Sequence, residues 1–383
     1  MLSAVSKLPG VVPLSLMAPI AKDGFGTVTV EGVPLSTCEQ VSALGFTLLL
    51  IPVGEVAMDY DRDYTVRLSG FKAESGLSFP SLRFKIHTEK RRLQDTKYAE
   101  HDEQTLVAAR EGMVLLRNDG VLPLRPGTIL NCFGTAQHMY RISATGASQI
   151  NPRWRPNFVQ SIREHSNFEI NSELSEFYKK PSVGAPDADM LQRAREKSDT
   201  ALILLTRHSG EMQDNRAVRG QYYLSEQEED MIRAVCGAFE NVVVILNTGY
   251  PIDMRWTKEY PIGAILYTGF AGMLSGYALM ELLDGRAHPS GKLPDTWPWD
   301  WYDNPVSKNM PTLGAGEPTL ADAAKGVRLY YEEDIYLGYR YFDTFGVPAA
   351  FPFGHGLSYT RFDCNASGIQ KTKGGISAHV NMA

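Results

Sequence analysis

Between residues 105 and 300 the chain alternates fully apolar runs with amphipathic stretches, and this alternation limits what it can fold into. Ala201 to Thr206 (ALILLT) and Val242 to Leu246 (VVVIL) are continuous runs of strand length. A strand that is apolar on both faces must be covered on both sides, which is typical of parallel strands between helices. We therefore predict an α/β fold in which helices sandwich a mostly parallel sheet.

The other elements of this region follow from the same periodicities. Ser225 with Glu228 three residues later is a capping box, which predicts a helix from there to about Phe239. The apolar spacing from Leu106 to Leu116 predicts a helix over those residues. The remaining predicted elements are strands at Thr128–Phe133 and Gly263–Tyr267 and helices at Asp187–Lys197 and Leu274–Leu283.

The segment before this region has the pattern of β structure. Residues 1–90 contain the runs VTVEGVPL, LLLIP, YTVRLSGFKAESG and LRFKIHT, which resemble a partial bacterial immunoglobulin-like (Ig-like) domain. Residues 91–104 are densely charged and predict a linker or an exposed helix. The predicted strands of the first segment are Thr27–Val30, Phe46–Pro52, Tyr64–Leu68 and Leu82–His87.

The segment after this region is rich in aromatic residues. We expect few regular elements in residues 301–362, a segment that we call the aromatic strap, because glycines and prolines punctuate the sequence. Within the strap, Glu332, Glu333 and Asp334 read as structural rather than as a metal site, and His355 reads as a turn residue. In residues 363–383 the side chains alternate as in the first strand of a further β domain.

Composition and charge exclude several classes of function. The formal net charge of −6 over 383 residues argues against nucleic acid as a partner. The most apolar run, Leu44–Val53, is about half the length needed to cross a bilayer, so no membrane span is expected. Prolines interrupt the apolar start of the chain, which argues against a signal peptide and favours a cytoplasmic location. The four cysteines are widely spaced and predict buried free thiols.

Sequence motifs for several common chemistries are missing. The run Ser290-Gly291-Lys292 has Arg286 where a phosphate loop needs glycine and Leu293 where it needs Ser or Thr. There is neither a G-x-S-x-G nor an H-E-x-x-H motif. These absences argue against a nucleotide-binding protein, a serine hydrolase and a zinc protease.

The strongest candidate site is the segment Thr206 to Ser225 (TRHSGEMQDNRAVRGQYYLS), which follows the buried run ALILLT. In open α/β sheets, ligands bind outside the carboxyl ends of the strands. Glu211 lies in this segment, preceded by Ser209 and Gly210, so a tight turn can direct its carboxyl group outward. The alternative is a solvated loop glutamate.

Five blocks of sequence, in order over about 260 residues, resemble glycoside hydrolase family 3, most closely its bacterial β-glucosidases. They match the family's second, α/β-sandwich domain and the strap leading to a fibronectin type III-like domain. We assign residues 105–300 to the former and residues 363–383 to the start of the latter. The blocks are AAREGMVLLRNDGVLPL, RHSGE with GQYYLS, ILNTGYPIDM, ELLDGRAHPSGKLPDTWP, and YEEDIYLGYRYFDTFG with FPFGHGLSYT.

The resemblance implies a retaining glycosidase with two carboxyl groups. In the family a barrel-borne aspartate is the nucleophile and the glutamate of an S-G-E loop is the acid/base, a role that falls here on Glu211. Retaining enzymes hold these carboxyl groups about 5–5.5 Å apart, and we expect burial beneath a barrel to raise the pKa of the acid. His208 and Asp214 flank Glu211 and are candidates to bind the sugar.

Three departures from the family pattern concern this loop. Met212 replaces a glycine, Asn215 replaces an arginine, and the glycine-rich loop expected nearby appears only as the residues 145–148 (TGAS). These departures bear on the geometry of the loop and with it on the substrate preference. The sugar stays open among glucose, which the closeness to β-glucosidases favours, xylose and N-acetylglucosamine, because in the family most contacts with the sugar come from the barrel. Met212 and Asn215 favour an alternative function, a non-catalytic carbohydrate-binding or scaffold protein derived from the hydrolase. No metal and no cofactor are expected, because proton transfer and carboxylate attack suffice for the reaction.

The length of the chain sets the remaining expectation. With residues 103–300 in the sandwich, 102 residues precede it and 83 follow it, whereas a (β/α)8 barrel needs at least roughly 200. We therefore expect this chain to supply the acid/base half of a β-glucosidase-like enzyme as a fragment or split-gene product. Its partners would be a barrel domain, in cis or in trans, and a β-linked oligosaccharide or glucoside. The oligomeric state is left open.

Overall fold

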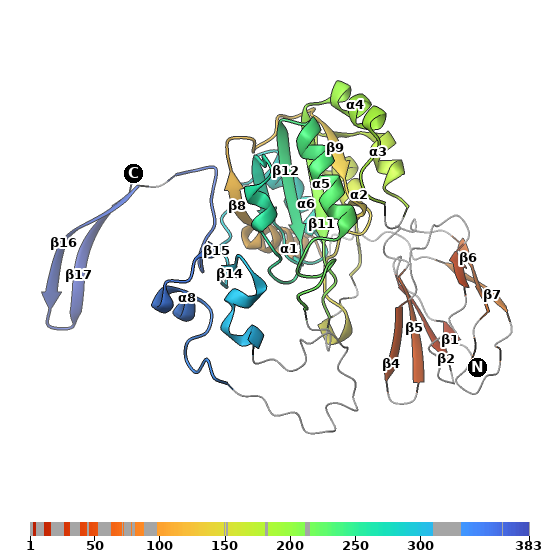
Figure 1. The fold of residues 1–383 in the computed structure, drawn as a ribbon, viewed down its shortest axis with the longest axis horizontal. Helices are drawn as coiled ribbons and strands as arrows, with labels where there is room; N and C mark the ends of the chain where they lie inside the picture. Colours follow the sequence, from red (N-terminus) through yellow and green to blue (C-terminus); the bar gives the residue numbers. More distant parts are fainter. Residues whose placement is uncertain are drawn as a thin grey trace.

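A six-stranded mixed sheet dominates the fold, with its strands in the order β10-β9-β11-β12-β13-β8 (Figure 1). Neighbouring strands are parallel except β8, which runs antiparallel to β13. The strands are β8 (Val114–Asn118), β9 (Ile129–Phe133), β10 (Glu169–Ile170), β11 (Thr200–Thr206), β12 (Asn241–Asn247) and β13 (Ala264–Tyr267). The predicted fold class is confirmed.

The protein is represented by a computed structural model. It describes residues 3–4, 11–16, 27–30, 39–43, 46–52, 63–70, 72, 78, 81–87, 98–148, 150, 152–180, 183–210, 215–308, 331–361 and 363–382. The helices are α1 (Ala99–Gly112), α2 (Phe158–His165), α3 (Ser172–Phe177), α4 (Ala188–Lys197), α5 (Glu226–Ala238), α6 (Ser275–Leu283) and α8 (Tyr339–Phe345). The 3-10 turns are η3 (Thr135–Gln137), η4 (Gly146–Ser148), η5 (Arg255–Lys258), η6 (Trp301–Asp303) and η7 (Pro305–Lys308).

Helices cover both faces of the sheet, and each strand contributes alternate side chains to two cores. In β11, Leu202 and Leu204 pack with α1, α2 and α6, while Ile203 and Leu205 pack with α3, α4 and α5. All four of these side chains are buried. Burial of one such side chain contributes roughly 1.5–3 kcal/mol, so a run that is apolar on both faces is what this position in the sheet requires.

Most of the elements predicted for the α/β region are confirmed to within two residues. The capping box is present, because Ser225 Oγ accepts from Glu228 N while the Glu228 carboxylate accepts from Ser225 N. The helix predicted over Leu106–Leu116 is wrong in its second half. Helix α1 ends at Gly112, and Leu116 lies in β8, where pairing with β13 outweighs the helical spacing of the apolar residues.

The N-terminal strands form two separate antiparallel sheets, of order β1-β2-β5-β4 and β3-β6-β7. All four strands predicted here are confirmed, whereas β1, β2 and β4 were not predicted. The identity of this segment as an Ig-like domain stays a prediction. The strands are β1 (Ser3–Ala4), β2 (Val11–Leu16), β3 (Thr27–Val30), β4 (Glu39–Ala43), β5 (Phe46–Pro52), β6 (Asp63–Ser69) and β7 (Leu82–His87).

The strap runs along β8, the last strand of the sheet. Leu357 N donates to Leu115 O at 2.8 Å, and His355 Nε2 donates to Leu116 O at 2.9 Å. His355 therefore has the structural role that the sequence predicted. The strap's strand β15 (Ala349–Phe351) also pairs with β14 (Trp297–Pro298). Beyond it, β16 (Cys364–Thr372) and β17 (Gly375–Met382) form a hairpin.

Two further expectations can be compared with the structure. Cys132 and Cys236 are free and buried, as predicted, and burial raises the pKa of the Cys236 thiol to about 11. Cys38 and the side chain of Cys364 lie outside the described residues. In the part of the chain that is described, no helix combines the length and apolarity that a membrane span requires.

Candidate functional site

The order of the strands places a topological switch point between β9 and β11. The connection that leaves β9 leads to β10 on one side, and the connection that leaves β11 leads to β12 on the other side. The two connections therefore separate at the carboxyl ends of β9 and β11. Crevices of this kind are where ligands bind in open α/β sheets.

A cavity of about 350 Å³ lies at this switch point. Its wall combines the residues that follow β9, the end of β11 and the first turn of α5, including Gly134, Arg141, His208, Gly220, Gln227 and Met231. This volume is within the range of small-molecule sites, and both polar and apolar residues line it. Arrangement and size together make this cavity the best candidate for a binding site among the described residues.

The segment after β11 starts beside the residues that follow β9. Thr145 N donates to Ser209 O at 3.0 Å, and Thr145 and Gly210 form an isolated parallel bridge. Thr145 Oγ1 lies 3.5 Å from His208 Nε2. Thr145, the first residue of the segment 145–148, therefore contacts the first residues of the candidate loop directly. This segment stands where the family resemblance predicts a glycine-rich loop.

A buried arginine closes the base of the same segment. Only 3% of the Arg207 side chain is exposed. Its Nη1 donates to Thr206 O at 2.8 Å and its Nε donates to Gln221 O at 2.6 Å, so one side chain joins two points of the backbone. Nη1 and Nη2 also donate to Oε1 and Oε2 of Glu228, at 2.7 and 2.9 Å.

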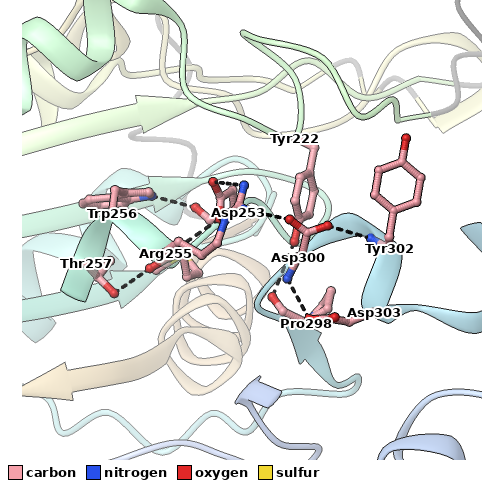
Figure 2. Close-up of polar contacts among 10 residues, drawn as sticks. Tyr222, Asp253, Arg255, Trp256, Thr257, Pro298, Asp300, Tyr302 and Asp303 are labelled. Atoms are coloured by element: carbon pink, nitrogen blue, oxygen red, sulfur yellow. Dashed lines mark hydrogen bonds and ion pairs between the residues drawn. The ribbon is translucent and has the colours of Figure 1, made fainter. Parts of the chain in front are cut away.

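Downstream of the candidate loop, a charged cluster fixes the return of the chain to α5. Asp253 N donates to Tyr222 O at 2.9 Å. Arg255 then donates to both carboxylate oxygens of Asp253, at 2.9 and 3.1 Å, and to Asp300 at 2.5 Å (Figure 2). The hydrogen bonds with Asp253 raise the pKa of Arg255, and burial together with Asp253 and Asp300 raises the pKa of Tyr222. The raised pKa values keep Arg255 charged and Tyr222 neutral within this cluster.

A second buried polar side chain, Asn247 at the end of β12, connects the loops of the carboxyl edge. Its Nδ2 donates to Arg141 O at 2.9 Å and to Gly269 O at 2.8 Å. Its Oδ1 accepts from Arg141 N at 2.6 Å and from Thr206 Oγ1 at 3.3 Å. One amide thereby links the last residue of β11 with residues that follow β9 and β13.

The residues predicted for the site have different outcomes. His208 lines the cavity, which places it where a ligand could be contacted. Glu211, Met212 and Asp214 lie outside the described residues, so their roles stay predictions. His208 and Gly220, which precede and follow these residues in the chain, both line the cavity.

The acidic run Glu332 to Asp334 does not form a ligand cluster. The side chains of Glu332 and Asp334 are exposed, and across the described residues no group of three or more His, Cys, Asp or Glu is placed to hold a metal ion. A structural or surface role for this part of the strap is therefore the better interpretation.

Sequence reasoning missed Arg207, Asn247 and the second contact of Glu228. The sequence does contain a signal for Arg207 and Asn247. Each is a polar residue at the carboxyl end of a fully apolar strand, which is the edge of the sheet where ligands bind. Glu228 was recognised only as the end of a capping box. Its pairing with Arg207 joins residues 21 apart and depends on the tertiary fold.

Comparisons with known proteins agree with this architecture. The family model for the glycosyl hydrolase family 3 C-terminal domain matches residues 113–339. The chain is 34% identical over 298 residues to a β-glucosidase of Ruminococcus albus, covering 72% of this chain and 30% of that protein. It is 30% identical over 286 residues to thermostable β-glucosidase B of Acetivibrio thermocellus, covering 74% and 36%.

Solved structures give the same result. The structure of β-glucosidase 3B from Thermotoga neapolitana in complex with glucose matches with a TM-score of 0.65 at 33% identity. That match covers 74% of this chain and 42% of that chain. The matches with the two curated relatives cover 30% and 36% of the length of those proteins. The chain therefore spans about a third of their length.

Proposed function

The chain belongs to glycoside hydrolase family 3, and from this we propose that it is the α/β-sandwich part of a retaining, β-glucosidase-type hydrolase. Its substrate would be a β-linked glucoside or oligosaccharide. The observation that carries the proposal is the position of the segment after β11. This segment leaves the sheet at the switch point, and its described parts on both sides of Glu211 line the cavity.

In this proposal Glu211 is the general acid and base. It donates a proton to the leaving glycosidic oxygen, and it then accepts a proton from the water that hydrolyses the glycosyl-enzyme. His208 and Asp214 are proposed to bind the sugar beside it. His208 has the better support of the two, because it lines the cavity.

The nucleophile is proposed to come from a (β/α)8 barrel that is joined to this chain or binds to it. The described residues form open sheets and hairpins and contain no closed barrel. Apolar side chains of the strap are also exposed, among them Tyr331 at 77% and Ile335 at 59%. An exposed apolar group is what we expect where another domain normally covers a surface.

The test is hydrolysis of an aryl β-glucoside with and without a barrel. The 383-residue chain alone should show no turnover, and the chain fused to or mixed with the barrel domain of a family member should be active. In that enzyme Glu211→Gln should lower kcat about 10²- to 10⁴-fold, because proton transfer to the leaving group is lost. The matched control is Glu240→Gln, on a glutamate whose side chain is 84% exposed.

Chemical rescue identifies the role of Glu211 more specifically. Glu211→Ala should regain activity in azide with a substrate whose leaving group needs no protonation, and the product should be the β-glucosyl azide. Turnover by the chain without a barrel would contradict the proposal. Oligosaccharide binding without turnover in the barrel-supplemented enzyme would instead support a carbohydrate-binding protein.

A further inference from the structure

We infer that Arg207 is a positioning residue, which holds the two ends of the segment that carries Glu211 and thereby fixes the location of the proposed acid/base. The catalytic part of this inference rests on the proposed function. The structural part does not, because it concerns described residues at both ends of the segment.

The first step is the geometry of the closure. Arg207 bonds the backbone at Thr206 O, where β11 ends, and at Gln221 O, where the chain returns. We call the residues between these two points, 207–220, the excursion. One side chain joins its two ends. Because the guanidinium is planar and has a fixed fork of donors, it sets the separation and the orientation of both ends together.

The second step is the anchor. Glu228 lies in the first turn of α5, and its carboxylate accepts from Arg207 and also from Ser225 N. The start of α5 and the base of the excursion are therefore fixed by the same two side chains. Helix α5 packs its apolar face on the sheet. This anchor therefore connects the loop to the packed core of the fold.

The third step is a comparison within the same segment. Arg219 pairs with Glu229, also in the first turn of α5, at 2.9 Å. The side chains of that pair are 55% and 38% exposed, whereas those of Arg207 and Glu228 are 3% and 20% exposed. A largely buried bidentate pair constrains geometry, and a single exposed contact does so only weakly. The chain thus contains its own matched control.

The fourth step is the consequence for chemistry. A shift of about 1 Å in a catalytic group can lower a rate about 100-fold. Loosening the base of the excursion should therefore reduce proton donation by Glu211 before it reduces substrate binding. Substrates with poor leaving groups depend on that proton, and substrates with good leaving groups do not.

The first measurement is hydrogen exchange on the full chain, which needs no activity. Arg207→Lys should increase amide exchange in residues 208–220 by about tenfold or more, because lysine cannot reach both carbonyl groups and the carboxylate. Arg219→Lys should leave exchange there unchanged. Unchanged exchange in Arg207→Lys, with wild-type circular dichroism, would overturn the inference whether or not the chain is part of a hydrolase.

The second measurement uses the barrel-supplemented enzyme. Arg207→Lys should lower kcat on an alkyl β-glucoside at least about tenfold more than on 2,4-dinitrophenyl β-glucoside, with KM little changed. An equal loss on both substrates would indicate a merely structural role and would overturn the inference. If Glu211→Gln itself shows no dependence on the leaving group, the proposed function fails while the exchange result still stands.

A second variant covers the case in which Arg207→Lys does not fold. In the double variant Arg207→Gln with Glu228→Gln, no unpaired charge is buried, and glutamine still completes the capping box. This variant should fold and show the same faster exchange in residues 208–220. A folded double variant with wild-type exchange would overturn the inference.

Discussion

The two ends of the parallel sheet use the same side chain for different purposes. At the amino end, Asn131 in β9 is completely buried, and at the carboxyl end Asn247 in β12 is 2% exposed. Asn131 Nδ2 lies within 3.2 Å of three carbonyl oxygens, those of Ala194, Ser198 and Thr200. These three residues lie in the last turn of α4, at its C-cap and at the start of β11.

Asn247 connects parts of the chain that are far apart in sequence. Its partners follow β9 and β13 or end β11, and they include Arg141 in the cavity wall. A buried amide at the amino end therefore stabilises the connection from α4 to β11 and the start of α3, whereas the same amide at the carboxyl end arranges the loops of the candidate site. Stability and function are separated along the length of the strands.

The largest effect is expected from Asn247→Ala. It leaves several buried donors and acceptors without partners, and the free energy of unfolding should fall by about 4 kcal/mol. Because the loops lose their common link, exchange should also increase in residues 206–210. Urea unfolding and hydrogen exchange measure the two effects, and a loss of stability without any change in these loops would contradict the division between the two ends.

A smaller effect is expected from Asn131→Ala, which should lower the free energy of unfolding by about 3 kcal/mol. The variant loses the three carbonyl contacts and the hydrogen bond from Asn171 Nδ2 at 2.8 Å. Exchange in residues 206–220 should stay at the wild-type rate, as should kcat of the barrel-supplemented enzyme. An altered kcat at wild-type folding would show that the amino end also shapes the site.

The smallest effect is the pH dependence contributed by His138, which lies just beyond β9 and donates from Nε2 to Ser175 O at 2.8 Å. Burial lowers its pKa in the folded state below the ordinary value of 6.5. The unfolded chain therefore binds a proton first, and stability falls as the pH decreases through 6.5.

Urea unfolding between pH 7.5 and 5.5 measures this dependence. His138→Gln should make the curve flatter, while His101→Gln, on an exposed helical surface, should leave it unchanged. An identical slope in wild type and His138→Gln would show that other groups cause the pH dependence.

Much of the sandwich could be predicted from the sequence because its signals are local. The run ALILLT and the capping box at Ser225 each contain within a few residues the reason for their structure. Leu116 was placed in a helix because apolar spacing does not reveal that β13 is available as a partner. Short strands such as β4 have weak local signals and depend on their neighbours.

The candidate site divides in the same way. The segment around Glu211 could be found from its motif and from its position after a buried strand. The cavity could not, because it forms where β9, β11 and α5 converge. The contact of Arg207 with Glu228 likewise requires the fold, since neither residue alone indicates the other.

The contact between the strap and β8 has a consequence for solubility. Leu357 satisfies a backbone carbonyl on the outer side of β8, a strand that otherwise presents unpaired groups able to recruit a strand from another molecule. The residues matched by the family model end at 339, before this contact. A shortened chain that stopped there would keep the matched family domain but leave the outer edge of β8 uncovered, and it should self-associate more strongly than the longer chain.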